Sequence, residues 1–356
     1  MSSPLLTHSR IQAFRTCNQK HFLAYEVGVR KTVKSKALRM GTAFHRGAEL
    51  VAKGMEIADA IAQAMLPYEV IPDGVEANTW AVEREKVLRL LHGYLNLYAN
   101  DGWEVVAAEH GVEIPLLHPS EKAEGFAGQF RLAGKMDRLV KRPLLDEVWL
   151  LETKTMSKDL SPSSSYWEKL PIDEQITRYV YYAKRLGYNV VGIIYDCIRK
   201  PTMEPIEIPL RDGDGKIIVL DSAGTRIFTK NGEPRQTGSE KEGYVRQVRM
   251  ETAEEYGDRL SADIAEHPEF YFARREVPRL QEQLDDFERE AWMDAIDLEL
   301  HQQFQHWPRN TAACLSPWRC EYFDLCKARW TPSDALPNGY EIVADVHPEL
   351  SPEEEV

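Results

Sequence analysis

The chain has 356 residues, a formal net charge of −13 and five cysteines. This length exceeds a typical domain, but a single enzyme core with helical additions accounts for it. No apolar run approaches a membrane span, and an odd number of cysteines without a signal peptide argues against a secreted disulfide framework. We therefore expect a cytoplasmic protein. The sequence indicates neither internal repeats nor an ATP-binding G-x-x-x-x-G-K-[ST] loop, so any helicase motor would lie on another chain.

The first predicted region is helical and basic, and runs from about Ser9 to Asn100. Between Arg10 and Arg46, nine Lys or Arg stand against one acid, so this stretch opposes the acidic charge of the whole chain. Its cations could line the approach to a site and release counterions from bound DNA; an ordinary solvated loop is the alternative. The candidates for DNA contact are Arg30, Lys31, Lys34, Lys36 and Arg39.

Within this region, residues 40–50 are expected to form a helix. The helix would place His45 and Glu49, four residues apart, on one side. His45 could bind a metal ion, with its ring held by a neighbouring acceptor. A histidine that is simply packed or capped is the alternative.

Two carboxylates and a lysine follow on neighbouring strands. Asp137 is expected at the end of one strand, and Glu152 and Lys154 at the end of the next. Because strand side chains alternate between faces, Glu152 and Lys154 point the same way, and Asp137 could share that face. Carboxylates suit Mg²⁺ or Mn²⁺, and an ammonium can orient water or stabilise negative charge. A solvated E-x-K face is the alternative. The strands are predicted near 104–117, 125–140 and 146–154.

A helix from Lys169 to Leu186 and a strand from Asn189 to Arg199 are predicted next. Gln175 and Tyr179 lie one helical turn apart, and they could contact a nucleic-acid backbone or hold a catalytic residue; simple packing is the alternative. Cys197 is interpreted as a packed strand residue. These elements predict a mixed sheet with helices on both sides.

The remaining chain is divided by composition. We expect an N-terminal cluster segment and helical region over 1–100, a core over 101–205 and an inserted hairpin or flap over 206–245. A C-terminal helical region over 246–342 would contain a long helix near 280–306, and residues 343–356 would form an acidic, disordered tail.

Four of the five cysteines lie towards the two ends of the chain. Four thiolates can hold zinc or an iron-sulfur cluster, and spacing alone does not separate these. Unrelated buried cysteines are the alternative. A shared site would join distant segments, so its role would be structural. The cysteines are Cys17, Cys314, Cys320 and Cys326.

In order along the chain, His45, Asp137, Glu152-Thr153-Lys154 and Gln175-x-x-x-Tyr179 resemble the motifs of the PD-(D/E)XK nuclease superfamily, specifically its RecB-like branch. The resemblance implies an α/β fold with a restriction-endonuclease-like core, in which helices flank a mixed central sheet, together with a helical N-terminal insertion and a C-terminal cysteine region. It also implies that His45, Asp137, Glu152 and the Thr153 carbonyl bind Mg²⁺ or Mn²⁺. Lys154 would then assist the attacking water, and Gln175 and Tyr179 would act as positioning residues near DNA.

One early and three late cysteines resemble the 4Fe-4S staple of AddB-type helicase-nucleases and CRISPR adaptation nucleases. In those families two residues usually separate the second and third ligands, whereas five separate Cys314 from Cys320 here. Cys314 is therefore the least secure ligand, and zinc remains an option.

The expected function is that of a metal-dependent DNA exonuclease acting on single-stranded or free-ended DNA in phage or bacterial recombination or repair, with endonuclease activity left open. Its partners would be DNA and a recombinase, single-strand-binding protein or helicase, and no membrane. One alternative is a catalytically idle DNA-binding or assembly module of a helicase or CRISPR adaptation complex. Another is an iron-sulfur electron-transfer protein, for which no flavin site or redox partner is indicated.

Overall fold

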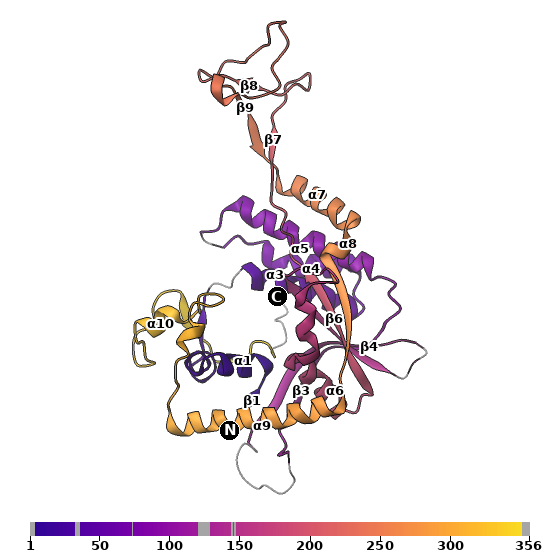
Figure 1. Ribbon diagram of the computed structural model, residues 1–356, viewed down its shortest axis with the longest axis vertical. Coiled ribbons are helices and arrows are strands. Elements are labelled where there is room, and N and C mark those ends of the chain that lie inside the picture. The colour runs from indigo at the N-terminus through magenta and orange to yellow at the C-terminus, as the bar shows by residue number, and fades with distance from the viewer. Residues whose placement is uncertain are drawn as a thin grey trace.

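The computed structural model describes residues 4–32, 36–72, 74–119, 129–143, 145 and 147–350. A central sheet carries helices on both faces (Figure 1), so the predicted α/β class is confirmed. Within these residues, no helix combines the length and the apolar character that crossing a bilayer would need.

The central sheet has six strands of mixed direction. They are β1 (Leu5–Leu6), β3 (Glu104–Pro115), β4 (Arg131–Lys141), β5 (Val148–Met156), β6 (Val190–Arg199) and β11 (Phe272–Pro278). The order is β1-β4-β5-β6-β11, and β3 pairs with the other edge of β4. Strands β1 and β4 are parallel, as are β5 and β6, whereas the other pairs are antiparallel.

One edge of β4 is divided between two partners. Residues 138–141 pair with β5, and residues 131–132 pair with β1. Beyond Leu151, β5 leaves β4 but continues along β6. In the described chain, residues 133–137 therefore have no strand partner on this edge. The two strands form a fork, and Asp137 lies at its branch point.

Helices cover the two faces of the sheet with separate apolar cores. One core joins the sheet to α6 (Glu174–Arg185) and α9 (Gln281–Phe304). In α6, the fully buried Ile176, Val180 and Ala183 follow the spacing of one helical face. The other core is formed mainly by α3 (Lys36–Ala52), α4 (Ile57–Met65), α5 (Ala77–Leu97) and α7 (Ala253–Glu266).

The two ends of the chain form a separate lobe. Strands β2 (Val29–Lys31) and β12 (Tyr340–Ile342) pair, and Leu23 and Val29 share a small core with Tyr322 and Trp330. Figure 1 shows indigo α1 beside yellow α10. We call residues 15–32 and 307–342 the cysteine lobe. The remaining short elements are α1 (His8–Thr16), α2 (Asn18–His21), η1 (Phe22–Glu26), η2 (Leu66–Tyr68), η3 (Ser165–Ile172), α8 (Pro268–Tyr271), η5 (Thr311–Ala313) and α10 (Phe323–Lys327).

The start of the predicted disordered tail is ordered. Val343 N–H donates to the Gly28 carbonyl, Arg30 donates to the Val346 carbonyl at 2.9 Å, and Thr7 Oγ1 donates to Glu349 at 2.5 Å. The prediction of disorder is therefore wrong for residues 343–350, because these contacts attach them to the N-terminal segment. Residues 351–356 lie outside the described chain.

The predicted insertion is a projecting arm, residues 206–250, which extends from the body at the top of Figure 1. Three successive turns repeat one pattern: the N–H of a glycine donates to the carbonyl of the residue three positions earlier. The turns are closed by Gly215 on Asp212, Gly224 on Asp221 and Gly232 on Thr229. The arm contains β7 (Glu207–Pro209), β8 (Val219–Leu220), η4 (Glu240–Glu242), β9 (Val245–Arg246) and β10 (Val248–Met250).

Candidate functional site

The two acidic residues meet at the fork between β4 and β5. Asp137 lies inside β4 rather than at its end as predicted. Its Oδ2 accepts a hydrogen bond from the Thr153 backbone N–H at 2.8 Å. This bond crosses the gap where the ladder has stopped. It therefore fixes the Asp137 side chain against the peptide that follows Glu152.

Glu152 and Lys154 form a buried ion pair next to Asp137. Glu152 is only 4% exposed, and Lys154 Nζ lies 2.7 Å from its Oε1. Burial raises the pKa of Glu152, and the negative charge of Asp137 raises it further. Burial alone would lower the pKa of Lys154, but Glu152 and Asp137 outweigh it and raise that pKa. The lysine thus stays charged between two carboxylates.

His45 reaches the same place from α3. Its Nδ1 lies 3.5 Å from Asp137 Oδ2. Burial lowers the pKa of His45, which favours the neutral imidazole that can bind a metal ion. The helix lies close to α5 because Gly47 has no side chain: an added Cβ would lie 2.2 Å from Leu91. The predicted helix and the convergence of His45 on Asp137 are both found.

Gln175 and Tyr179 complete the cluster from α6. Gln175 Nε2 donates to Glu152 Oε1 and to the Tyr179 hydroxyl, each at 3.3 Å. Asp173 caps the helix by accepting the Gln175 backbone N–H at 3.0 Å. Gln175 and Tyr179 therefore lie one helical turn apart, as predicted. Because Gln175 also contacts Glu152, the pair does more than pack against its neighbours. The predicted helical start at Lys169 is instead the short helix η3, and α6 begins at Glu174.

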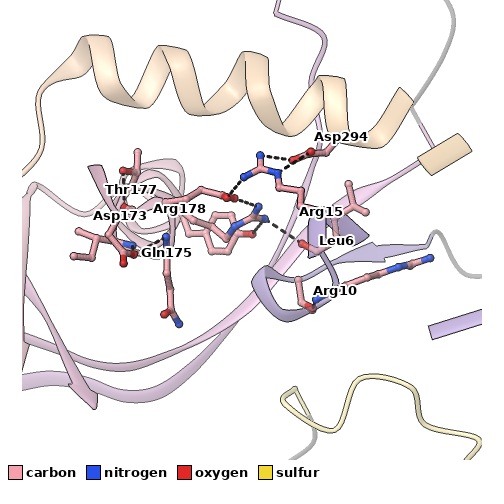
Figure 2. A network of polar contacts seen from close by, with 12 residues as sticks. Leu6, Arg10, Arg15, Asp173, Gln175, Thr177, Arg178 and Asp294 are labelled. Carbon is pink, nitrogen blue, oxygen red and sulfur yellow. Dashed lines mark hydrogen bonds and ion pairs between the residues drawn. The ribbon is translucent and has the colours of Figure 1, made fainter. Parts of the chain in front are cut away.

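A polar network anchors α6 behind Gln175 (Figure 2). The fully buried Arg178 donates to Glu174 at 2.6 Å and to the Leu6 carbonyl at 3.4 Å. Arg15 of α1 forms an ion pair with Glu174 and binds both oxygens of Asp294 on α9. The network ties α6 to β1, α1 and α9, so the helix that holds Glu152 is fixed from three directions.

A second network, missed by sequence reasoning, supports Thr153. Arg138 Nη2 donates to Thr153 Oγ1 and to the Tyr94 hydroxyl, each at 2.9 Å. Tyr94 donates to the fully buried Asp196 at 2.5 Å, and Arg274 Nε lies 3.2 Å from the same carboxylate. Arg138 follows Asp137 directly in the sequence. A charged residue next to a predicted active-site acid could have drawn attention to Arg138. Its partners could not be identified from the sequence, because they lie on distant elements.

The donor set at the fork fits a hard divalent cation. Among the described residues, no three His, Cys, Asp or Glu side chains are gathered closely enough to hold one metal ion. However, the negative charge of Asp137 adds to burial in raising the pKa of Glu152, and a divalent cation would neutralise such neighbouring negative charge. His45, Asp137, Glu152 and the Thr153 carbonyl, all at one fork, are therefore suitable ligands.

The four predicted cysteine ligands line one cavity of about 300 Å³ in the cysteine lobe. Burial raises the pKa of the Cys326 thiol, and the other three thiols, Cys17, Cys320 and Cys314, raise it further. Four cysteines on one cavity are a donor set that zinc or an iron-sulfur cluster could use. Cys314 is included despite its long spacing. Cys197 is fully buried in β6, as predicted.

The predicted DNA-contact residues have different environments. Arg30 donates to the carbonyls of Ala24, Val29 and Val346, and Arg39 binds Glu83 at 3.1 Å. Both guanidinium groups are thus engaged by the protein, and DNA contact by these residues stays a prediction. Lys31 is exposed, 5.9 Å from the Tyr340 ring. Lys34 lies outside the described residues, and the side chain of Lys36 is not described.

Comparisons with known proteins agree with this geometry at the level of the family. The model of the PD-(D/E)XK nuclease superfamily matches residues 5–327. No curated protein matches. The solved structures that match include a crystal structure from Eubacterium rectale named "Putative exonuclease", with 12% identity and a TM-score of 0.43 over 94% of this chain and 91% of that one.

Proposed function

The chain belongs to the PD-(D/E)XK nuclease superfamily, and from that premise we propose that it is a divalent-metal-dependent deoxyribonuclease. We place it in the RecB-like branch, as an exonuclease that degrades free-ended or single-stranded DNA in phage or bacterial recombination or repair. The observation that supports this proposal most directly is that Asp137, Glu152 and Lys154 converge at the β4–β5 fork. Each comes from a strand that the sheet holds rigidly, as a catalytic site requires.

The chain's own residues divide the work of phosphodiester hydrolysis. His45, Asp137, Glu152 and the Thr153 carbonyl would hold Mg²⁺ or Mn²⁺, which when bound polarises the phosphate and lowers the pKa of water. Lys154 keeps its proton beside Glu152 and can orient the attacking water or stabilise charge on the phosphate.

Gln175 fixes Glu152 Oε1 by its amide. Burial raises the pKa of Tyr179, and Glu152 raises it further, so its hydroxyl stays neutral while it accepts a hydrogen bond from Gln175. The two residues thus keep one carboxylate in a single orientation without adding charge.

A structural 4Fe-4S cluster on Cys17, Cys314, Cys320 and Cys326 is the second part of the proposal, and zinc is the alternative occupant. Support comes from the four thiols on one cavity and from their position between the two ends of the chain. The setting proposed is the cytoplasm, with DNA and a recombinase, single-strand-binding protein or helicase as partners.

The test is digestion of end-labelled linear DNA and closed circular DNA with Mn²⁺ after anaerobic purification. Wild-type protein should degrade only the linear substrate, and Asp137→Ala and Lys154→Ala should each lower the rate by at least about 100-fold. Lys141→Ala is the matched control, because this lysine lies on β4 in a partly exposed pair with Glu104. Failure of wild-type protein to cut either DNA, or undiminished cutting by Lys154→Ala, would contradict the assignment.

A further inference from the structure

We propose that the rim of the cysteine cavity is a binding site for single-stranded nucleic acid, where one base stacks on the indole of Trp318. The choice of partner rests on the proposed nuclease function. The site itself rests on four observations: the exposure of this tryptophan, the constraint on its loop, the cations around it and the geometry of stacking.

Trp318 is unlike every other tryptophan of the chain. All eight tryptophans lie in the described residues, and the other seven are buried or half-buried, whereas Trp318 is 82% exposed. Its neighbour Leu315 is 61% exposed. A large aromatic ring held in water loses the burial that normally stabilises it. Such rings are typical of binding surfaces.

The loop that carries Trp318 is constrained from both sides. The Cys320 N–H donates to the Cys314 carbonyl at 2.8 Å and closes the loop. Arg319 binds Asp324 at 2.5 Å, and its guanidinium carbon lies 4.4 Å from the centre of the Phe323 ring. Ligand binding would therefore order little new backbone, which favours affinity.

Among the Lys, Arg, Asp and Glu side chains that line the cavity beside Trp318, basic ones outnumber acidic ones. Lys20, Arg309 and Arg319 line the same cavity, against a single acid, Glu321. Lys20 and Arg319 have acidic partners, but Arg309 is exposed and forms no ion pair with any described residue. The whole chain has a formal net charge of −13, so the free cation of Arg309 on this rim is a local feature that a phosphate can contact.

An aromatic face beside cations matches the chemistry of a single strand. Bases of a single strand can leave their neighbours and stack on a protein ring, and phosphates then follow the basic side chains. In the interior of a duplex both faces of each base pair are already covered. The same rim should therefore favour a single strand over a blunt duplex.

The experiment measures fluorescence anisotropy of a fluorescein-labelled 20-nucleotide oligo(dT) in EDTA, with a blunt 20-base-pair duplex in parallel. Trp318→Ala should weaken oligo(dT) binding by about 5- to 100-fold, while Trp318→Phe stays within about threefold of wild type. Leu315→Ala is the control, because it removes an exposed apolar side chain from the same loop without removing a ring. Arg309→Ala should reduce the salt slope of binding by about 0.7.

Unchanged oligo(dT) affinity in Trp318→Ala would overturn the proposal, as would an equal loss in Leu315→Ala. A change of self-association without a change of DNA affinity would point to a protein partner and overturn it too. Iron content and absorbance of each variant report on the cysteine site. If wild-type protein cuts no DNA but binds oligo(dT) through Trp318, the proposed function fails and the stacking site stands. If the protein cuts DNA but its oligo(dT) affinity does not depend on Trp318, the proposed function stands and the stacking site fails.

Discussion

At the scale of single residues, the sequence specified the chemistry of the fork better than its supports. The convergence of His45, Asp137, Glu152 and Lys154 could be predicted, because strand alternation and the resemblance to a nuclease family both placed them at one site. Arg138 could not, because its role depends on Tyr94 and Asp196, which come from α5 and β6. A buried charge is explained only by its partners, and these are set by tertiary structure.

Arg138→Met tests whether this arginine is a structural support. It removes the charge that faces the fully buried Asp196 and the donor to Thr153 Oγ1, while keeping an unbranched apolar stem. We expect the free energy of unfolding to fall by about 1–3 kcal/mol, since Thr153 Oγ1 loses its donor and the buried Asp196 keeps only Tyr94 and Arg274 as partners among the described residues. Urea unfolding followed by circular dichroism measures it.

The matched control for this change is Arg249→Met. Arg249 pairs with Glu255 at the surface, where both side chains are about two-fifths exposed, and exposed pairs contribute about 0–1 kcal/mol. Equal losses in the two variants would show that Arg138 contributes no more than a surface ion pair.

At the scale of elements, the predicted strands and helices between residues 104 and 199 are confirmed with shifts at their ends, because their apolar periodicity is strong. Two strands of the central sheet were missed. Strand β1 has only two residues, and β11 exposes several of its side chains, so neither carries a clear pattern. The predicted core of 101–205 is consequently too short, since both strands lie outside it.

The spacing between β4 and α6 depends on Gly134. A Cβ at this position would lie 2.9 Å from Cε2 of the fully buried Tyr182 and 3.2 Å from Cε1 of Tyr179. Gly134→Ala should lower the free energy of unfolding by about 1–3 kcal/mol, because rigid rings must move in a packed core. Cleavage should also fall, since Tyr179 holds Gln175. Thermal unfolding and digestion of labelled linear DNA measure the two effects.

Gly111→Ala supplies the comparison for this substitution. Gly111 lies on β3, directly paired with β4, but a Cβ there meets no atom within 4 Å. The free energy of unfolding of the Gly111→Ala variant should differ from that of the wild type by less than about 0.5 kcal/mol. A similar loss in both variants would mean that strand propensity, not the approach of α6, explains the effect.

At the scale of the whole molecule, the cysteine lobe joins the chain ends. Spacing predicted which cysteines share a site, but it could not predict that β2 pairs with β12 or that residues 343–350 bind the N-terminal segment. Such pairings between distant segments leave little local pattern. The lobe has only a small apolar core of its own, so metal binding would add to its stability.

Cys320→Ala and Cys326→Ala should each give colourless protein with little iron and a melting temperature lowered by several degrees, because metal binding contributes to folding free energy. Visible absorbance, iron analysis and calorimetry after anaerobic purification measure these properties. Cys197→Ala should retain its colour, since Cys197 lies buried in β6 away from the cavity. Full iron content and stability in Cys326→Ala would contradict the structural role.

The projecting arm is expected to be dispensable for folding. Its base is a short antiparallel ribbon in which the Leu210 N–H donates to the Gln247 carbonyl at 2.8 Å, so residues 211–246 can be replaced by Asn-Gly, which closes a two-residue hairpin. The arm's own side chains are mostly exposed, and little of the central core is lost with them. The shortened protein should keep its melting temperature within a few degrees and should still cleave a short single-stranded oligonucleotide at the wild-type rate. Insoluble protein, or the loss of cleavage in a folded one, would instead make the arm part of the core or of the site.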